Sequence, residues 1–237
     1  MAALDWCETH GDTDGDGFVE YFRETPNGLS NQGWKDSYDS IFHRDGRLAE
    51  GPIALVEVQA YVYEARLQAA EIADRLGETA RATAWRAKAA ALREKFNAAF
   101  WCPELSTFAL ALDGEKRPCR VKASNAGHVL MTDLTSPERV QGVVAALFSP
   151  ELFCGWGVRT VAVGEARYNP MSYHNGSVWP HDNALIALGL ARAGHKPALE
   201  KIFEGLLSVQ SHQSDRRLPE LFCGFQRKPR RGPTSYP

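Results

Sequence analysis

Three segments of the sequence combine aromatic rings with carboxylates, amides and imidazoles. They span residues 28–40, 173–183 and 217–225. In a sugar site, aromatic faces cover the apolar C–H face of a pyranose while fixed polar side chains bind its hydroxyls. We therefore expect these three segments, which are far apart in the sequence, to converge on a carbohydrate.

A fourth segment has the spacing of a calcium-binding loop. Asp12, Asp14, Asp16 and Gly17 match the alternating pattern of such loops, but Arg23 stands where a bidentate glutamate is expected. Two alternatives stay open here: a Ca²⁺ ion held by the three aspartates, or an acidic turn surrounded by water. We expect any metal at this loop to be structural rather than catalytic.

Helices must position these segments, because apolar residues recur every three to four positions over much of the chain. The clearest pattern, over residues 51–77, predicts a long buried helix with Gly77 as its left-handed C-terminal cap. A second helix over residues 80–100 would complete an antiparallel hairpin. Further helices are predicted at residues 2–8, 125–131, 137–148, 182–193 and 197–211, with a short strand and turn at 107–113.

Composition argues against several classes of partner. A net charge of −2 over 237 residues gives no basic field for nucleic acid or an anionic membrane, and the basic stretch at 227–231 is short. No apolar stretch approaches the roughly 20 residues of a membrane span. No signal sequence follows Met1, which favours a cytoplasmic setting. The five cysteines form no Cys-x-x-Cys pair, so we interpret them as free thiols.

Four motifs carry a resemblance to a known family: NQGWKDSYDS at 31–40, CGWGVRT at 154–160, YHNGSVWPHDNALIALGL at 173–190 and LPELFCGF at 218–225. In this order they resemble the catalytic domain of bacterial amylo-α-1,6-glucosidases and mannosylglycerate hydrolase-like proteins. The resemblance covers residues 5–236. It implies an all-α fold, an (α/α)6 toroid of helical hairpins, and glycoside hydrolysis with inversion and without a required cofactor.

The resemblance makes Asp36 the general acid and Glu220 the general base. Inversion requires the two carboxyl groups about 6.5–9.5 Å apart, so that a water fits between one of them and the sugar. A general acid keeps its proton near neutral pH when burial raises its pKa. We therefore expect Asp36 to be buried beside Trp34, and Lys35 to point away, because an inward ammonium would lower that pKa.

Other roles stay open for both carboxylates. Asp36 could cap the N-terminus of a helix over residues 37–42. Glu151 is a rival of Glu220, because the hexapeptide Pro-Glu-Leu-Phe-Cys-Gly occurs once around each of them. This repeat is interpreted either as chance combined with similar local geometry, or as a shared structural role at the mouth of a barrel.

By the same resemblance, the substrate contacts come from all three segments and from the CGWGVRT motif. They are Gln32, Trp34, Trp156, Tyr173, His174, Asn175, Trp179, His181 and Asp182. Structural roles stay open for some of them, since Asp182 could cap the helix that follows it and Trp179 could belong to the core.

We predict a single catalytic domain over residues 1–237 with both ends cut, because the first residues resemble the tail of a helix and the last ten form a Pro- and Arg-rich end without periodicity. A complete toroid needs twelve helices, and only about seven are recognisable. The predicted activity is exo-acting, inverting hydrolysis of a terminal glucosyl or mannosyl unit from an α-linked oligosaccharide, a glycogen-type branch or a small glycoside. An open ring would also fit a carbohydrate-binding fragment without catalysis. A polysaccharide lyase or sugar epimerase using His174 or His181 is a third alternative, and the oligomeric state stays open.

Overall fold

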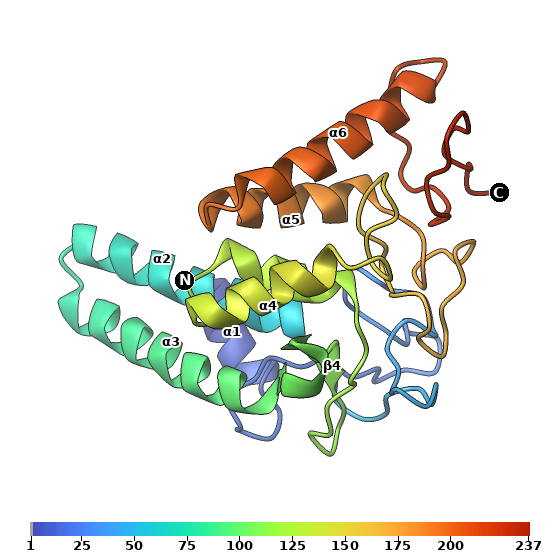
Figure 1. Ribbon diagram of the computed structural model, residues 1–237. Helices are drawn as coiled ribbons and strands as arrows, with labels where there is room; N and C mark the ends of the chain where they lie inside the picture. The colour runs from blue at the N-terminus through green and yellow to red at the C-terminus, as the bar shows by residue number, and fades with distance from the viewer. Residues whose placement is uncertain (1) are drawn as a thin grey trace.

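The computed structural model describes residues 2–237 and is mainly helical, as the sequence predicts. These residues contain six α-helices and two 3-10 helices, joined by long loops and two pairs of very short strands. Two helical hairpins, α2–α3 and α5–α6, account for most of the helical residues (Figure 1).

The first hairpin confirms the strongest prediction from the sequence. Helix α2 (Val56–Arg75) runs antiparallel to α3 (Thr79–Ala99). Gly77 has a φ of 77°, the left-handed conformation expected of a C-terminal glycine cap. Helix α3 buries Ala82, Trp85, Ala89, Leu92 and Phe96, whose spacing of three to four residues forms one apolar face.

The second hairpin pairs α5 (Pro180–Arg192) with α6 (Lys196–His212). Each of these helices has a proline in its first turn, where the missing N–H costs no hydrogen bond. The 3-10 helix η2 (Ser124–Met131) packs against both α2 and α5 and is almost completely buried. It therefore links the two hairpins and brings its own side chains between them.

The remaining elements are short. Helix α1 (Ala2–His10) packs on α2, and α4 (Pro137–Leu147) is capped by the Ser136 hydroxyl. The strand and turn expected near residues 107–113 are two separate strands. The chain runs through β1 (Ala54–Leu55), β2 (Trp101–Cys102), the 3-10 helix η1 (Pro103–Leu105), β3 (Thr107–Phe108) and β4 (Ala111–Leu112), with β1 antiparallel to β4 and β2 antiparallel to β3.

Long loops gather at one end of the helices, on the right in Figure 1, where the C-terminus also lies. They come from three distant parts of the chain, which include the three segments expected to form a sugar site. No helix forms over residues 37–42, because residues 37–41 are in turns and bends and Phe42 forms an isolated β-bridge with Leu48, so the alternative role of Asp36 as a helix cap is wrong.

The observed fold is a mostly helical arrangement of hairpins. A complete ring of twelve helices is not present within residues 2–237. The part of the chain described by the structure also has no helix that is both long and apolar enough to cross a membrane.

Candidate active site

Trp34 lies at the centre of an aromatic cluster that joins two of the three predicted segments. Its ring centroid is 4.9 Å from that of His181, 5.7 Å from His174 and 5.8 Å from Trp179. All three contacts are edge-to-face, a favourable geometry for aromatic pairs. The rings of His174 and Trp179 stack on each other with centroids 4.9 Å apart.

Tyr173 joins the third segment to this cluster. Its ring packs edge-on against Trp179, with centroids 4.8 Å apart, and its hydroxyl lies within hydrogen-bonding reach of Glu220. Burial raises the pKa of the Tyr173 phenol, and the hydrogen bond to Glu220 and the charges of Glu220 and Asp36 raise it further. Glu220 therefore lies at the phenol, and Asp36 is near enough for its charge to act on it, although 184 positions separate the two carboxylates in the sequence.

The two proposed catalytic carboxylates are open to solvent. The side chain of Asp36 is 51% exposed, and Glu220 is also exposed. The expected burial of Asp36 beside Trp34 is thus wrong for this structure. The loop before Asp36 turns Trp34 inward and leaves the carboxyl group outside, at the rim of the aromatic cluster.

His174 supports the turn that follows Asp36. Its Nδ1 lies 2.7 Å from the Ser37 hydroxyl oxygen and 3.4 Å from the Ser37 main-chain nitrogen. Burial lowers the pKa of His174 to about 4, and the nearby Lys35 charge acts in the same direction. A neutral imidazole accepts through Nδ1 and carries its proton on Nε2, so His174 fixes Ser37 and with it the main chain beside Asp36.

Lys35 does not point out to solvent, which corrects the expectation from the sequence. Its side chain is 1% exposed and donates from Nζ to the main-chain oxygen of Thr160 at 2.6 Å. The Nζ atom also lies 5.1 Å from the centroid of the Trp34 ring. Burial lowers the pKa of Lys35 to about 8, although the charges of Asp182 and Glu57 act in the opposite direction.

A buried polar network lies behind Trp34, and the local sequence patterns do not indicate it. His128 Nε2 is 2.7 Å from Asp182 Oδ1, and the Tyr61 hydroxyl hydrogen-bonds to His128 Nδ1 at 2.5 Å. Asn125 Nδ2 donates to Glu57 Oε1 at 2.9 Å. Burial raises the pKa of the Glu57 carboxyl. We name the set Lys35, Glu57, His128 and Asp182 the buried floor.

Several polar atoms of this region have no hydrogen-bond partner within the protein. They include the second carboxylate oxygens of Glu57 and Asp182 and the indole nitrogen of Trp34. Buried polar groups are normally paired within the protein or with ordered water, so these atoms are the places in the floor that water would satisfy.

Asp182 does not cap α5. The N-cap position is Trp179, and Asp182 is in the first turn of the helix with its side chain completely buried. Trp179 is itself buried, and its indole nitrogen donates to the Tyr173 main-chain oxygen at 2.8 Å. The core role considered for Trp179 thus applies to most of its ring, although its edge also contacts Trp34.

Three of the predicted sugar contacts either lie outside the aromatic cluster of Trp34 or form hydrogen bonds within the protein. Trp156 is buried in a separate cluster and covered by Arg227, whose guanidinium carbon is 4.3 Å from the ring centroid. Asn175 donates to the Asp39 main-chain oxygen at 3.2 Å and so ties two loops together. Gln32 is exposed and donates to the Phe22 main-chain oxygen at 3.3 Å.

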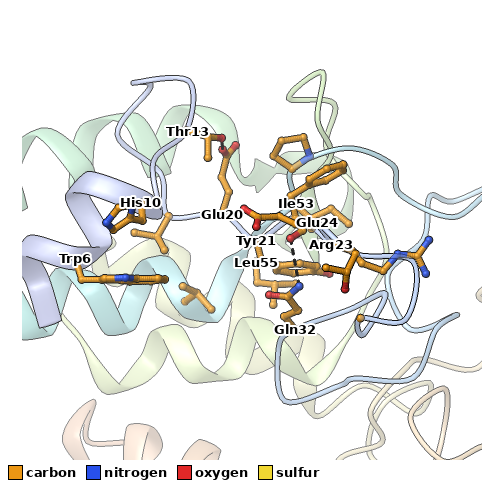
Figure 2. Close-up of a pocket in the computed structure, with 16 residues that line it drawn as sticks. Trp6, His10, Thr13, Glu20, Tyr21, Arg23, Glu24, Gln32, Ile53 and Leu55 are labelled. Carbon is orange, nitrogen blue, oxygen red and sulfur yellow. Dashed lines mark hydrogen bonds between the residues drawn. The ribbon is translucent and has the colours of Figure 1, made fainter.

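Gln32 also borders a cavity of about 630 Å³ between α1 and the loop that leads to Asp36 (Figure 2). Trp6 and His10 of α1 line one side of it, and Tyr21 and Arg23 line the other. Among the residues that line it, Gln32 is the one proposed sugar contact, and neither Asp36 nor Glu220 borders the cavity.

The hexapeptide repeat has a structural explanation in Arg159. Its guanidinium donates to the main-chain oxygens of Pro150 and Glu151 in the first copy, at 3.2 and 3.0 Å, and to Gly224 in the second, at 2.6 Å. The two copies thus share one buried arginine, which favours a shared structural role over chance. The carboxylate of Glu151 interacts with Ser149, whereas Glu220 is the copy that reaches Tyr173.

Comparison with known proteins agrees with a carbohydrate-active site. The family model of the mannosylglycerate hydrolase MGH1-like glycoside hydrolase domain matches residues 1–235. The chain belongs to this glycoside hydrolase family. No curated protein matches it.

Solved structures of helical glycosidases share the fold of this glycoside hydrolase domain. The GH63 mannosylglycerate hydrolase of Thermus thermophilus in complex with Tris has a TM-score of 0.63 at 16% identity, covering 73% of this chain and 41% of that one. The neutral trehalase of Saccharomyces cerevisiae has a TM-score of 0.64 at 16% identity, covering 79% of this chain and 37% of that one.

A protein described as a sialidase is also similar, with a TM-score of 0.73 at 13% identity, and the match covers 94% of this chain and 20% of that one. At these identities the likeness concerns the fold. The chain spans less than half the length of each of these three structures.

Proposed function

We propose that this glycoside hydrolase domain hydrolyses a terminal α-linked hexosyl unit with inversion, using Asp36 as general acid and Glu220 as general base. The observation that carries the proposal is the position of Tyr173, whose hydroxyl lies within reach of Glu220 and whose ring packs on the aromatic cluster of Trp34, while Asp36 Oδ1 lies 3.9 Å from Nδ1 of the neighbouring His174. A pair of carboxyl groups, one as acid and one as base, is the minimum apparatus of an inverting glycosidase.

In the proposed reaction Asp36 donates its proton to the glycosidic oxygen as the bond to the anomeric carbon breaks. Glu220 removes a proton from a water molecule that attacks the same carbon from the opposite face. The products are the free aglycone and a sugar of inverted configuration, and the two carboxyl groups exchange protons with solvent before the next cycle. Both side chains are exposed, so this exchange needs no channel.

A terminal, uncharged sugar is the substrate that the surrounding residues favour. Trp34, which is only partly buried, offers aromatic surface to the apolar face of a sugar. We propose a glucosyl or mannosyl unit, linked α to an oligosaccharide, a glycogen-type branch or a small glycoside. Of the similar structures, one is a mannosylglycerate hydrolase and another a trehalase, and both names agree with α-linked small glycosides.

The test is a substrate panel offered to the purified chain. It contains maltotriose, isomaltose, an α-mannosylglycerate and the β-linked disaccharide cellobiose, with released monosaccharide measured by chromatography. Release of a monosaccharide from at least one α-linked compound, with cellobiose intact, is the expected result. Cleavage of cellobiose alone would contradict the proposed linkage.

A carbohydrate-binding role without catalysis is the second candidate. It is favoured by the aromatic cluster around Trp34, which offers surface to a sugar whether or not the two carboxylates act on it. The same panel separates the two functions when binding is measured alongside turnover. Saturable binding of an α-linked compound with no product after prolonged incubation would support the binding role.

A further inference from the structure

The chain contains two asparagine–glycine pairs, Asn27–Gly28 and Asn175–Gly176, and the fold places them in opposite surroundings. Glycine has no Cβ, so nothing shields its main-chain nitrogen from the side-chain amide of the residue before it. The other asparagines precede glutamine, alanine or proline. These two pairs are therefore the positions where attack of a main-chain nitrogen on an asparagine side chain is least hindered.

Asn27 lies in an exposed turn. Residues Thr25 to Gly28 form a β-turn with a proline in its second position, and one main-chain hydrogen bond, from Gly28 N to Thr25 O at 3.0 Å, closes it. The first three residues of the turn are exposed to solvent. Exposed turns open at a small cost in free energy, so the Gly28 nitrogen can turn towards the Asn27 side-chain amide while the rest of the protein stays folded.

The second pair is locked in the interior. Asn175 is 1% exposed, and its Nδ2 donates to the Asp39 main-chain oxygen at 3.2 Å. The main-chain nitrogen of Gly176 donates to the Thr160 hydroxyl oxygen at 2.8 Å. A Cβ on Gly176 would lie 2.6 Å from the Asn169 main-chain oxygen, so the backbone is tightly packed here. Cyclisation at Asn175 requires both hydrogen bonds to break and two loops to separate, which makes the necessary opening far more costly than at Asn27.

Aspartate–glycine pairs in the acidic loop undergo the same cyclisation more slowly, because a carboxylate is a poorer electrophile than an amide. Asp14 and Asp16 are also held in place, since the Lys116 ammonium lies 3.0 Å from Asp14 Oδ2 and 2.9 Å from Asp16 Oδ2. Oxygens of Asp12, Asp14 and Asp16 lie within 4.8 Å of one another, and a Ca²⁺ ion at this loop stays a prediction. The exposed amide of Asn27 is thus the more reactive group.

We propose that Asn27 is a site of spontaneous modification, at which the folded chain converts asparagine to aspartate and isoaspartate while Asn175 stays intact. The Gly28 nitrogen loses its proton to solvent and forms a bond to Asn27 Cγ. The bond from Cγ to Nδ2 breaks, and the amide nitrogen leaves as ammonia after taking up a proton from water. Water then opens the resulting succinimide ring at one of its two carbonyl carbons. One opening gives aspartate, and the other gives isoaspartate, in which the main chain runs through Cγ. No group is oxidised or reduced.

The modification falls in a loop whose two ends are joined beside the candidate active site. Gln32 Nε2 donates to the Phe22 main-chain oxygen at 3.3 Å, and Arg23 Nη1 donates to the Ser30 hydroxyl oxygen at 3.3 Å. These bonds close a loop over residues 22–32, with Asn27 in its middle. Isoaspartate adds a carbon atom to the main chain of this loop, and both products add a negative charge. The modification therefore alters a loop that ends at Gln32, one of the proposed sugar contacts.

The experiment follows both pairs in the same wild-type sample. The folded protein is kept in mildly alkaline buffer, digested with trypsin at intervals and analysed by chromatography and mass spectrometry. Trypsin releases Asn27 in the peptide of residues 24–35 and Asn175 in the peptide of residues 168–192. The first peptide is expected to convert roughly tenfold faster than the second, or more, and to give two products of equal mass that separate on the column. Fragmentation is expected to locate the change at Asn27 and not at Asn31.

Two controls separate the effect of the fold from that of the sequence. In guanidinium chloride the two peptides are expected to convert at similar rates, because both pairs are then equally accessible. Gly28→Ala is expected to slow the conversion of Asn27 several-fold in the folded protein, since a methyl group crowds the attacking nitrogen. The nearest neighbours of the new Cβ would be Thr25 Oγ1 at 3.1 Å and Arg23 Cγ at 3.2 Å, both in exposed side chains.

Three results would overturn the proposal. The first is conversion of both peptides at equal rates in the folded protein. The second is a peptide of residues 24–35 that stays intact in the folded protein over the time in which the denatured chain converts it. The third is a modification located at Asn31 instead of Asn27.

Discussion

The two proposed catalytic carboxylates and the buried floor behind them are built in opposite ways. Asp36 and Glu220 are exposed and make few bonds to the protein, whereas the side chains of the buried floor are at most 1% exposed and bond to one another, to Asn125 or to the main chain. The groups proposed to react contribute little to the fold, and the groups that fix the site contribute much. Substitutions should therefore separate activity from stability across these two regions.

The largest expected effect is on activity. Asp36→Asn and Glu220→Gln should each lower the rate of hydrolysis roughly 10²- to 10⁴-fold, the range typical of a lost acid or base, and shift the free energy of unfolding by about 0.5 kcal/mol or less. The measurements are initial rates on the best α-linked substrate and urea unfolding. Glu151→Gln, in the other copy of the hexapeptide, is the matched control and should keep full activity. A variant of Asp36 or Glu220 with wild-type rates would remove that residue from the mechanism.

The next largest effect is on stability, and it tests whether the buried floor stabilises the fold. His128→Phe leaves the completely buried Asp182 carboxylate without its 2.7 Å partner, and such a loss typically costs roughly 3–5 kcal/mol. Urea unfolding measures this cost. His10→Phe, at an exposed position of α1, is the control and should change little. Equal stability of the two variants would show that the floor is not the rigid part of the site.

The stability of the folded state should depend on pH because of His174. Its folded pKa of about 4 is below the ordinary value of 6.5, so the folded state keeps the imidazole neutral while the unfolded chain takes up a proton. The full stability is thus present above pH 6.5 and is lost progressively as the pH falls towards 4. At 1.36 kcal/mol for each tenfold difference in proton affinity, the loss amounts to roughly 3 kcal/mol.

His174→Gln provides the comparison for this loss. Urea unfolding of both proteins at several values between pH 7 and pH 4 should give curves that converge as the pH falls, because the variant lacks the buried imidazole. Parallel curves would mean that His174 is as easily protonated in the folded state as in the unfolded chain.

The smallest expected effect concerns Tyr61, which is 38% exposed and bonds to His128 from the edge of the floor. Tyr61→Phe removes one hydrogen bond and should cost about 1 kcal/mol in urea unfolding. Tyr38→Phe is the control, because Tyr38 is 72% exposed and its replacement should leave the free energy of unfolding unchanged. If both variants are equally stable, the network ends at His128.

The helices are predictable from the sequence and the buried floor is not, for physical reasons. Apolar spacing and Gly77 are local signals, so they locate the α2–α3 hairpin to within a few residues. The inward position of Lys35 has no such signal, because its partner, the Thr160 main-chain oxygen, is 125 positions away and leaves no mark in the local pattern. One signal is present for Glu57, since a carboxylate inside an apolar helical run needs a partner.

The same distinction applies to the site. The convergence of the three polar, aromatic segments follows from their composition and from the family resemblance, and the structure brings them together around Trp34 and Tyr173. Trp156 is grouped with them because its motif resembles a structural or sugar-contact loop, and its ring packs under Arg227. A tryptophan beside glycines is consistent with either role, and only its three-dimensional neighbours decide between them.

The most direct test of the central claim is the configuration of the sugar first released. Proton NMR of a fresh digest of the cleaved α-linked substrate follows the anomeric signals before mutarotation mixes them. If Asp36 and Glu220 act as an acid and a base on opposite faces of the sugar, the β-anomer appears first. Initial release of the α-anomer would contradict this account, because it would require a nucleophilic carboxylate in place of an activated water.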